Sequence, residues 1–365
     1  MSGRPTTQTD HARHHPAHCM APGLFRSLKG RSRTDRPALD IRYTWGDAEY
    51  HFLGVALGVE DMRVLQALTA IAGVRGLQLP HESTRPRDPH WERLRRTLED
   101  TPADGSPRDH RSATAAALVT SRYRLAVEAG WEPHSARRMH LLLEALERLG
   151  AISLYVTHGA KITGPYRLLA FLLDRDTDRL LIALNPHIAA TILGTIPSVA
   201  YVSLVEARAL TTDPSRLLHQ WLSAWIGPGQ ARLISIDAIC SHIWPDRATD
   251  RKLRDRRLKA RASLDEIAAL PYWQVTPLRP DTWRISRRRG LPSVGVYRHR
   301  RWGVPASTLG CTGIDAPPDA HPHHSRYQRG SQPPASLPDE TALVDTREYL
   351  GREALDDLAP SGPWR

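Results

Sequence analysis

The sequence predicts an α+β protein, mainly helical, with two tandem winged-helix domains between a flexible basic N-terminal arm and a disordered C-terminal tail. Residues 57–184 and 213–286 each predict the same order of elements: helix, strand, helix, helix and then a β-ribbon. Residues 1–39 carry seven basic and two acidic side chains. Residues 290–365 hold ten of the 29 prolines and few apolar runs, a composition that cannot offset the entropy lost on folding.

Four segments follow from this organisation. We expect the basic arm at residues 1–39, the first winged-helix domain at 40–195, the second at 200–289 and the Pro-rich tail at 290–365. At 365 residues the chain has the length of two ordinary domains. Within the first domain, residues 80–111 are rich in Pro, Arg, Asp and His and predict a long irregular excursion.

The composition excludes several classes of protein. Hydrophobic residues make up 41% of the chain, but no apolar run approaches the ~20 residues of a membrane span. The N-terminus lacks the apolar stretch of an export signal, so we expect a cytoplasmic protein with no membrane partner. The formal net charge of +11, carried mostly by arginine, suits a polyanionic partner. GC-rich coding DNA explains the excess of arginine over lysine equally well.

The first domain begins with an amphipathic helix. Apolar side chains at 3.6-residue spacing predict this helix over residues 57–72, and a short strand follows at 76–79. Within the excursion we expect a helical turn at 91–98. Helical character resumes at Ala113, and a turn at Gly130 separates the next two helices. The remaining elements are helices at 121–129 and 135–149 and strands at 152–157, 166–173 and 179–184.

The second domain repeats this order. Asp213 and Pro214 predict the start of a helix, because aspartate caps helices and proline fits their first turn. Gly227 and Pro228 end it. The elements that follow are a strand at 232–236, a short helix at 237–243, a long helix at 249–270 and a wing made of strands at 272–276 and 282–286.

The long helix carries the most informative segment of the sequence. Residues 251–261 hold seven cationic side chains and one acid. At 100° per residue, Leu253, Ala260 and Leu264 share one face, so the helix can pack and still present positive charge. A solvated charged helix is the alternative, but the segment occupies the position of a recognition helix. The expected DNA-binding residues of this helix are Arg251, Lys252, Arg254, Arg257, Lys259 and Arg261.

Two smaller cationic groups accompany this helix. We expect Arg284 and Arg287 to contact the DNA backbone beside the wing. In the first domain the corresponding helix presents Arg137 and Arg138, a weaker signal because glutamates follow them. The expected partner is double-stranded DNA, and phosphate contacts make its binding weaken steeply with salt.

No catalytic, cofactor or metal site is expected, and we predict that the protein is not an enzyme. The Asp174 to Asp178 segment resembles a calcium loop, but Arg179 stands where the invariant glycine belongs, so a hairpin turn is favoured. The histidines near Cys19 lie in the basic arm and predict adventitious metal binding only. The chain contains none of the phosphate-loop, serine-hydrolase or zinc-protease motifs.

Several runs of the sequence resemble one family. The most specific reads His15-Pro-Ala-His-Cys-Met-Ala-Pro-Gly-Leu-Phe-Arg-Ser-Leu-Lys29. Others are Ala183-Leu-Asn-Pro-His-Ile-Ala189, Glu206-Ala-Arg-Ala-Leu210, Arg216-Leu-Leu-His-Gln220 and Trp244-Pro245. Over residues 14–287, apart from the excursion, the chain is similar to replication protein C, the replication initiator of IncQ-type plasmids.

The resemblance implies a specific role. Members of that family have two winged-helix domains, bind tandem direct repeats called iterons at a plasmid origin and open adjacent AT-rich DNA. They recruit the plasmid-encoded helicase and primase, and related initiators use the first domain for contacts in a homodimer. A bacterial, plasmid-associated protein is therefore expected. The Pro-rich tail lies outside the resemblance.

Two other functions stay open at the level of sequence. One is a winged-helix transcriptional regulator that binds an operator, which has the same fold as an initiator. The DNA sequence beside the gene distinguishes a regulator from an initiator. Direct repeats next to an AT-rich stretch favour initiation, whereas an inverted repeat favours regulation. A relaxase or nuclease requires a tyrosine or carboxylate site with clustered metal ligands, which the sequence does not show.

Overall fold

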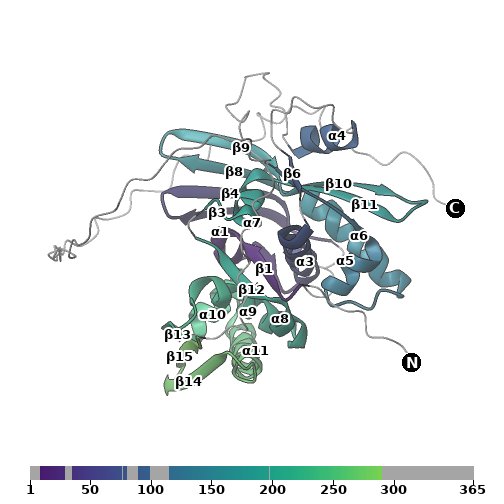
Figure 1. Cartoon of the computed structure of the whole chain (residues 1–365). Helices are drawn as coiled ribbons and strands as arrows, with labels where there is room; N and C mark the ends of the chain where they lie inside the picture. The colour runs from purple at the N-terminus through teal and green to yellow at the C-terminus, as the bar shows by residue number, and fades with distance from the viewer. Residues whose placement is uncertain are drawn as a thin grey trace, which may run out of the picture. The chain divides into compact units, whose positions relative to one another are not determined.

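The computed structural model describes residues 9–28, 35–75, 77–79, 89–98, 115–196 and 198–289 (Figure 1). All of them belong to one unit of the chain, Met1–Arg298. The expected Pro-rich tail lies outside the described residues, as does the excursion apart from one helix. That helix is α4, Pro89–Leu98, which confirms the turn expected at 91–98.

The second half of the chain folds in the order expected from its sequence. Helix α9 leads into strand β13, helices α10 and α11, and a hairpin of β14 and β15 (Figure 1). The strands form an antiparallel sheet in the order β13-β15-β14. Thr212, one residue earlier than expected, caps α9 by accepting a bond from the Ser215 amide. The bounds are α9 Asp213–Trp225, β13 Ala231–Ser235, α10 Ile236–Ile243, α11 Asp250–Ala268, β14 Trp273–Arg279 and β15 Thr282–Arg287.

The first half repeats this topology around a larger sheet. Its strands run in the order β10-β11-β7-β6, so β7, β11 and β10 correspond to β13, β15 and β14. The corresponding helices are α3, α5 and α6. The bounds are α3 Val59–Arg75, β6 Leu77–Leu79, β7 Ala115–Ser121, α5 Arg122–Glu128, α6 Ala136–Gly150, β10 Leu169–Asp174 and β11 Arg179–Leu184.

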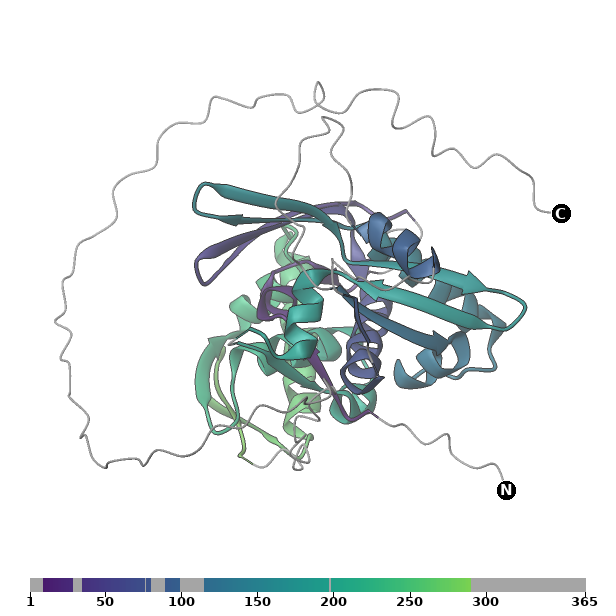
Figure 2. The ribbon, with the colours of Figure 1, turned by 45° about the horizontal axis from the view of Figure 1, so that its top comes forward.

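Strand β7 corrects the expectation of helix from Ala113 onward. The run from Ala115 to Leu118 is rich in residues that favour helices, which explains the expectation. In the fold this run pairs with β11 on one edge and β6 on the other, and Ala117 and Leu118 are fully buried. Tertiary pairing therefore outweighs the local preference. Helix α4 covers this sheet through Leu94 and Leu98 (Figure 2).

The first half of the chain also forms a second sheet. Its strands are antiparallel in the order β3-β4-β8-β9. The single strand expected at 166–173 is divided, because β9 ends at Arg167 in this sheet and β10 begins at Leu169 in the other. The bounds are β3 Ala38–Trp45, β4 Ala48–Val55, β8 Ser153–His158 and β9 Lys161–Arg167.

The described residues of the N-terminal segment, 9–28 and 35–39, are folded, contrary to the expected flexible arm. Strand β1 pairs with β12 and strand β2 with β5, and Ala12, Ala17 and Leu24 are at most 1% exposed. Its helix is only five residues long, too short for a periodic apolar stripe to reveal it. The bounds are β1 His11–His14, α1 Pro16–Met20, β2 Phe25–Arg26, β5 Leu57–Gly58 and β12 Ala200–Ser203.

The two halves share one apolar core. A continuous cluster of buried side chains includes Phe52 and Leu65 from the first half and Leu218 and Ile285 from the second. A buried hydrogen bond of 2.7 Å from the Gln66 amide to the Gln220 carbonyl joins α3 to α9. Helices α7, Pro186–Leu193, and α8, Leu204–Ala209, lie between the halves in the chain. Helices and strands both contribute to this core, so the α+β class is confirmed, whereas "mainly helical" understates the sheets.

Candidate nucleic-acid interface

Helix α11 packs through one face and leaves the other open. Ala260, Leu264 and Ile267 are at most 1% exposed in the core formed with α9 and α10. Asp250 in the first turn adds a negative charge where the helix dipole favours one. The opposite face, which includes Arg254 and Leu258, is exposed. In Figure 1, α11 lies beside the β14–β15 hairpin, as the recognition-helix interpretation requires.

Three of the DNA-binding residues expected on α11 are free for a ligand. Arg251, Lys252 and Arg254 are exposed, and none has a hydrogen-bond or ion-pair partner among the residues that the structure describes. All three lie in the first two turns of α11. Because they are not neutralised by nearby acids, they present their charge outward.

The other three expected cations of α11 are paired with acids. Arg257 donates two bonds of 2.8 Å to Asp237 of α10, and this bonding lowers the pKa of the Asp237 carboxyl. Lys259 pairs with Asp255 within α11. A third pair joins Arg261 to the wing turn and remains half-exposed. These three cations are therefore held by the protein itself, although their side chains still reach the surface.

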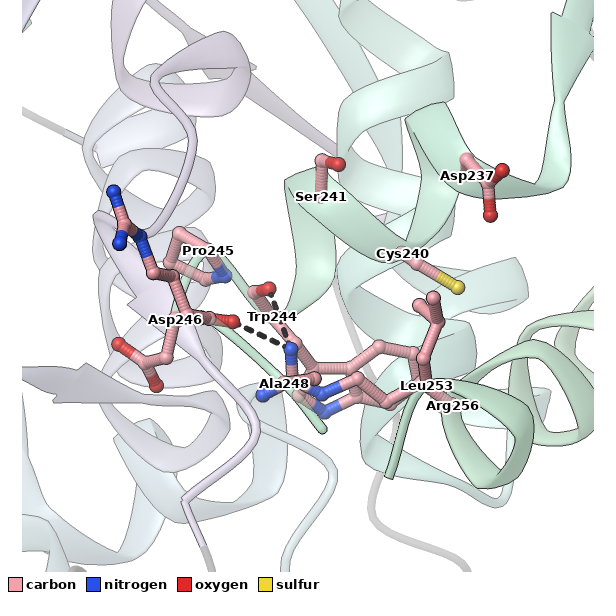
Figure 3. A pocket seen from close by; sticks show the side chains of 10 residues that line it. Asp237, Cys240, Ser241, Trp244, Pro245, Asp246, Ala248, Leu253 and Arg256 are labelled. Atoms are coloured by element: carbon pink, nitrogen blue, oxygen red, sulfur yellow. Dashed lines mark hydrogen bonds between the residues drawn. The ribbon is translucent and has the colours of Figure 1, made fainter. Parts of the chain in front are cut away.

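Arg256, which is not among the expected DNA-binding residues, is a buried cation of α11. Arg256 is 6% exposed and donates to the backbone carbonyls of Trp244 at 3.2 Å and Asp246 at 2.6 Å. Its guanidinium lies 5.9 Å from the centre of the Trp244 ring. Figure 3 shows these bonds at the wall of a pocket of about 330 Å³ next to the start of α11. Arg256 precedes the buried Ala260 by four residues, about one helical turn, so the sequence places both on the packed face of α11.

The two arginines predicted to lie beside the wing are on opposite faces of its sheet. Arg284 is exposed on the outer face of the sheet, where it lies opposite Leu233 of β13. Arg287 is 2% exposed, so its side chain is buried and does not lie on the surface beside the wing, where we expected it to contact DNA. Side chains alternate along a strand, and Arg287 shares the inward face with Ile285, two residues earlier. Residues two apart on a strand lie on the same face, so an inward-facing Ile285 predicts from the sequence that Arg287 also faces inward.

The buried Arg287 ties the wing to the junction of the two halves. Its guanidinium donates to the carbonyls of Ser223 at 3.2 Å and Tyr201 at 3.1 Å. Burial lowers the pKa of Arg287, whereas the nearby Glu206 raises it. Glu206 in turn accepts bonds from His219 at 2.9 Å and Trp273 at 3.2 Å. Strands β12 and β15 and helices α8 and α9 thus meet around one buried network.

The partners in this network favour the ionised form of the Glu206 carboxyl. Burial opposes its charge, but the bonds from His219 and Trp273 and the charge of Arg287 hold its pKa below the ordinary value. A buried charge needs such partners, because leaving it unpaired costs several kcal/mol.

The corresponding helix of the first half also begins at a cationic surface. Ser135 caps α6 by accepting a bond from the Arg138 amide, and Arg137 and Arg138 are exposed in the first turn. The guanidiniums of Arg138 and Arg63 lie 5.9 and 5.7 Å from the centre of the Trp131 ring. Burial and the charges of neighbouring arginines lower the pKa of Arg63 to about 9. Arginine side chains are thus concentrated at the start of α6.

The N-terminal histidines form part of the core. The Nε2 atom of His14 lies 3.2 Å from the Thr69 hydroxyl, and that of His15 lies 3.1 Å from the Tyr50 hydroxyl. His18 is 3% exposed beside them. Within the described ranges, no three His, Cys, Asp or Glu side chains are placed to hold a metal ion together. Nor does any described helix have both the length and the apolar composition to cross a bilayer.

Comparison with known proteins decides the family. The model of replication protein C (RepC) matches residues 6–289, which include both halves, the N-terminal segment and all of α11. The chain belongs to the RepC family. This confirms the resemblance seen in the sequence, and membership supports a replication initiator.

Among solved structures, one similar to this RepC-family protein is the crystal structure of domains 2 and 3 of RctB, as selenomethionine derivatives. The match has 7% sequence identity and a TM-score of 0.44, and covers 75% of this chain and 98% of that one. No match was found among curated proteins.

Proposed function

We propose that this RepC-family protein is a plasmid initiator that binds tandem direct repeats at its origin. It opens adjacent AT-rich DNA and brings the replicative helicase and primase to the separated strands. In this proposal each half acts as a winged helix, in a bacterial cytoplasm, and the first half provides contacts for a homodimer. Family membership and the repeated topology of the two halves support the proposal.

The observation that carries the proposal is the open face of α11. Arg251, Lys252 and Arg254 are exposed and unpaired within the described part of the chain, while the opposite face of the same helix is anchored in the core. An α-helix fits the major groove of B-DNA, where arginine pairs with guanine edges and both arginine and lysine pair with phosphates. A second cationic helix start, at Arg137 and Arg138, offers a further contact.

In the proposed mechanism the protein opens DNA without catalysing a covalent reaction. Several copies on successive repeats bend or wrap the duplex, and the strain concentrates in a neighbouring AT-rich segment that unstacks at low cost. Binding energy drives the separation of the strands. We accordingly propose that the chain is not an enzyme and works without a cofactor.

The proposal is tested by footprinting the purified protein on DNA that flanks its own gene, at two salt concentrations. We expect protection that repeats at a regular interval beside an AT-rich stretch and that fades at the higher salt concentration. A single protected inverted repeat would instead indicate an operator-binding regulator. Nicking of the DNA would indicate a nuclease or relaxase.

A double variant tests whether α11 is responsible for the protection in the footprint. Replacing Arg251 and Arg254 together by alanine removes two of the three free cations, and we expect repeat binding to weaken at least ~100-fold. Arg96 of α4 is an exposed arginine outside the proposed interface, so Arg96→Ala is the matched control and should bind normally. Both variants should retain the melting temperature of the wild type, since neither residue is buried.

A further inference from the structure

The open face of α11 is not purely cationic. Leu258 lies in its middle and is 63% exposed, although it belongs to a helix whose other large apolar side chains pack inward or are partly covered. Ala262, one turn further along, is also exposed. Exposing a leucine to water forgoes the free energy of burial, which a ligand that covers Leu258 would recover.

The neighbours of Leu258 define what can approach it. At 100° per residue, Arg251, Arg254, Leu258 and Ala262 fall within about 80° of one another around the helix axis, on the face opposite Ala260. Arg257 and Arg261, on either side in sequence, are held by Asp237 and Asp281 and leave the leucine uncovered.

The surroundings favour a polyanion over an apolar protein surface. Around Leu258 the exposed cations are Arg254, one turn earlier, which has no partner among the described residues, and Lys259, next to it, which pairs with Asp255. An apolar partner that covered Leu258 would also have to desolvate these charges, which is costly. Duplex DNA offers phosphates to the cations and, in the major groove, one apolar group on a base edge, the C5-methyl of thymine.

We propose that Leu258, with Ala262 beside it, reads thymine methyl groups in the major groove. The inference rests on the proposed function, because it requires α11 to enter that groove. From Arg251 to Ala262 the helix rises about 17 Å, which corresponds to about five base steps of 3.4 Å. The face therefore reads a short segment in which the arginines contact guanine edges or phosphates at one end and the apolar pair contacts thymines at the other.

The test uses the full chain and duplexes selected from a random library by their binding. Each thymine in the selected sequence is replaced in turn by deoxyuridine, which lacks the methyl group but keeps every hydrogen-bonding group. Burial of a methyl group is worth about 0.8 kcal/mol, so we expect wild-type affinity to fall about fourfold at one or two positions. Leu258→Ala should bind the thymine and uracil duplexes equally well.

Two further variants keep the test decisive. Leu258→Met retains an apolar side chain and should keep the discrimination. Ile162→Ala removes another exposed apolar side chain, 65% exposed on β9, and should behave as the wild type. The inference is overturned if no uracil substitution affects the wild type, or if Leu258→Ala still discriminates. It is also overturned if that variant changes only the oligomeric state.

The same experiment also tests the proposed function, through an outcome different from those that test Leu258. If no duplex is enriched from the library, the assignment of DNA as the partner fails, and the role of Leu258 fails with it. If duplexes are enriched but uracil has no effect, only the role of Leu258 fails.

Discussion

The Arg261 guanidinium donates to the Asp281 carboxylate at 2.5 Å and so joins helix α11 to the turn of the β14–β15 hairpin. The pair spans twenty residues of chain and remains about half-exposed. Asp281 has a φ of 60°, in the left-handed region that aspartate and asparagine adopt more readily than most residues. The pair therefore fixes the position of the hairpin relative to the helix while leaving both side chains near the proposed DNA surface.

Asp281→Asn should loosen this connection without disturbing the turn. We expect a loss of stability below about 1 kcal/mol, because exposed pairs contribute little. Non-specific binding should strengthen, since one negative charge is removed, and the preference for selected over random duplexes should fall. Asp265→Asn removes an exposed acid from the same helix without breaking the pair, so it serves as the control. Equal preference in the two variants would show that the pair does not position the wing.

Arg287→Ala should destabilise the fold. The change leaves the carbonyls of Ser223 and Tyr201 without their donor and removes a charge that faces Glu206. We expect a loss of about 3 kcal/mol in the free energy of unfolding, measured by chemical denaturation. The adjacent Arg288 is exposed, and Arg288→Ala should change stability by less than about 0.5 kcal/mol. Similar stabilities for the two variants would contradict the buried network.

The buried histidines should make the fold sensitive to acid. Burial lowers the pKa of His14 and of His15 from 6.5 to about 4. As the pH falls below 6.5, the unfolded chain takes up protons that the folded chain does not, so stability is lost between about pH 6.5 and pH 4. Between pH 7 and pH 5 the loss should be about 2 kcal/mol for each histidine. The pKa of the neighbouring His18 is lowered as well, by burial and by the nearby histidines.

Denaturation at pH 7 and pH 5 measures this effect. The variant His14→Gln cannot take up the proton, so its stability should change less between the two pH values than that of the wild type. His140→Gln alters an exposed histidine of α6 and should leave the difference unchanged. A wild type equally stable at both pH values would show that these histidines do not titrate as described.

The sequence predicts most clearly those elements whose side chains repeat with a regular period. Helices α9 and α11 are expected within two residues of their observed ends, because their apolar faces are continuous and their ends carry capping, proline or glycine signals. Strand β7 could not be predicted in this way. Its Ala and Leu residues favour a helix locally, and only pairing with distant strands makes them a strand.

The candidate site follows from sequence only in part. Charge density in residues 251–261 locates the helix, but not which of its cations are free. The acids that hold Arg257 and Arg261 lie twenty residues away in each case, so the pairs appear only once the chain is folded. The N-terminal segment shows the same limit, because strand β1 pairs with a strand that lies more than 100 residues later, as when His11 pairs with Ser203.

Contact between Arg254 and a guanine edge in the major groove is the central expectation. It is measured by replacing single guanines of the selected duplex with 7-deazaguanine, which lacks the N7 acceptor. We expect the wild type to lose about tenfold in affinity at one guanine and Arg254→Ala to lose nothing further there. The same loss in both proteins, or no loss at any guanine, would show that α11 does not read the major groove through Arg254.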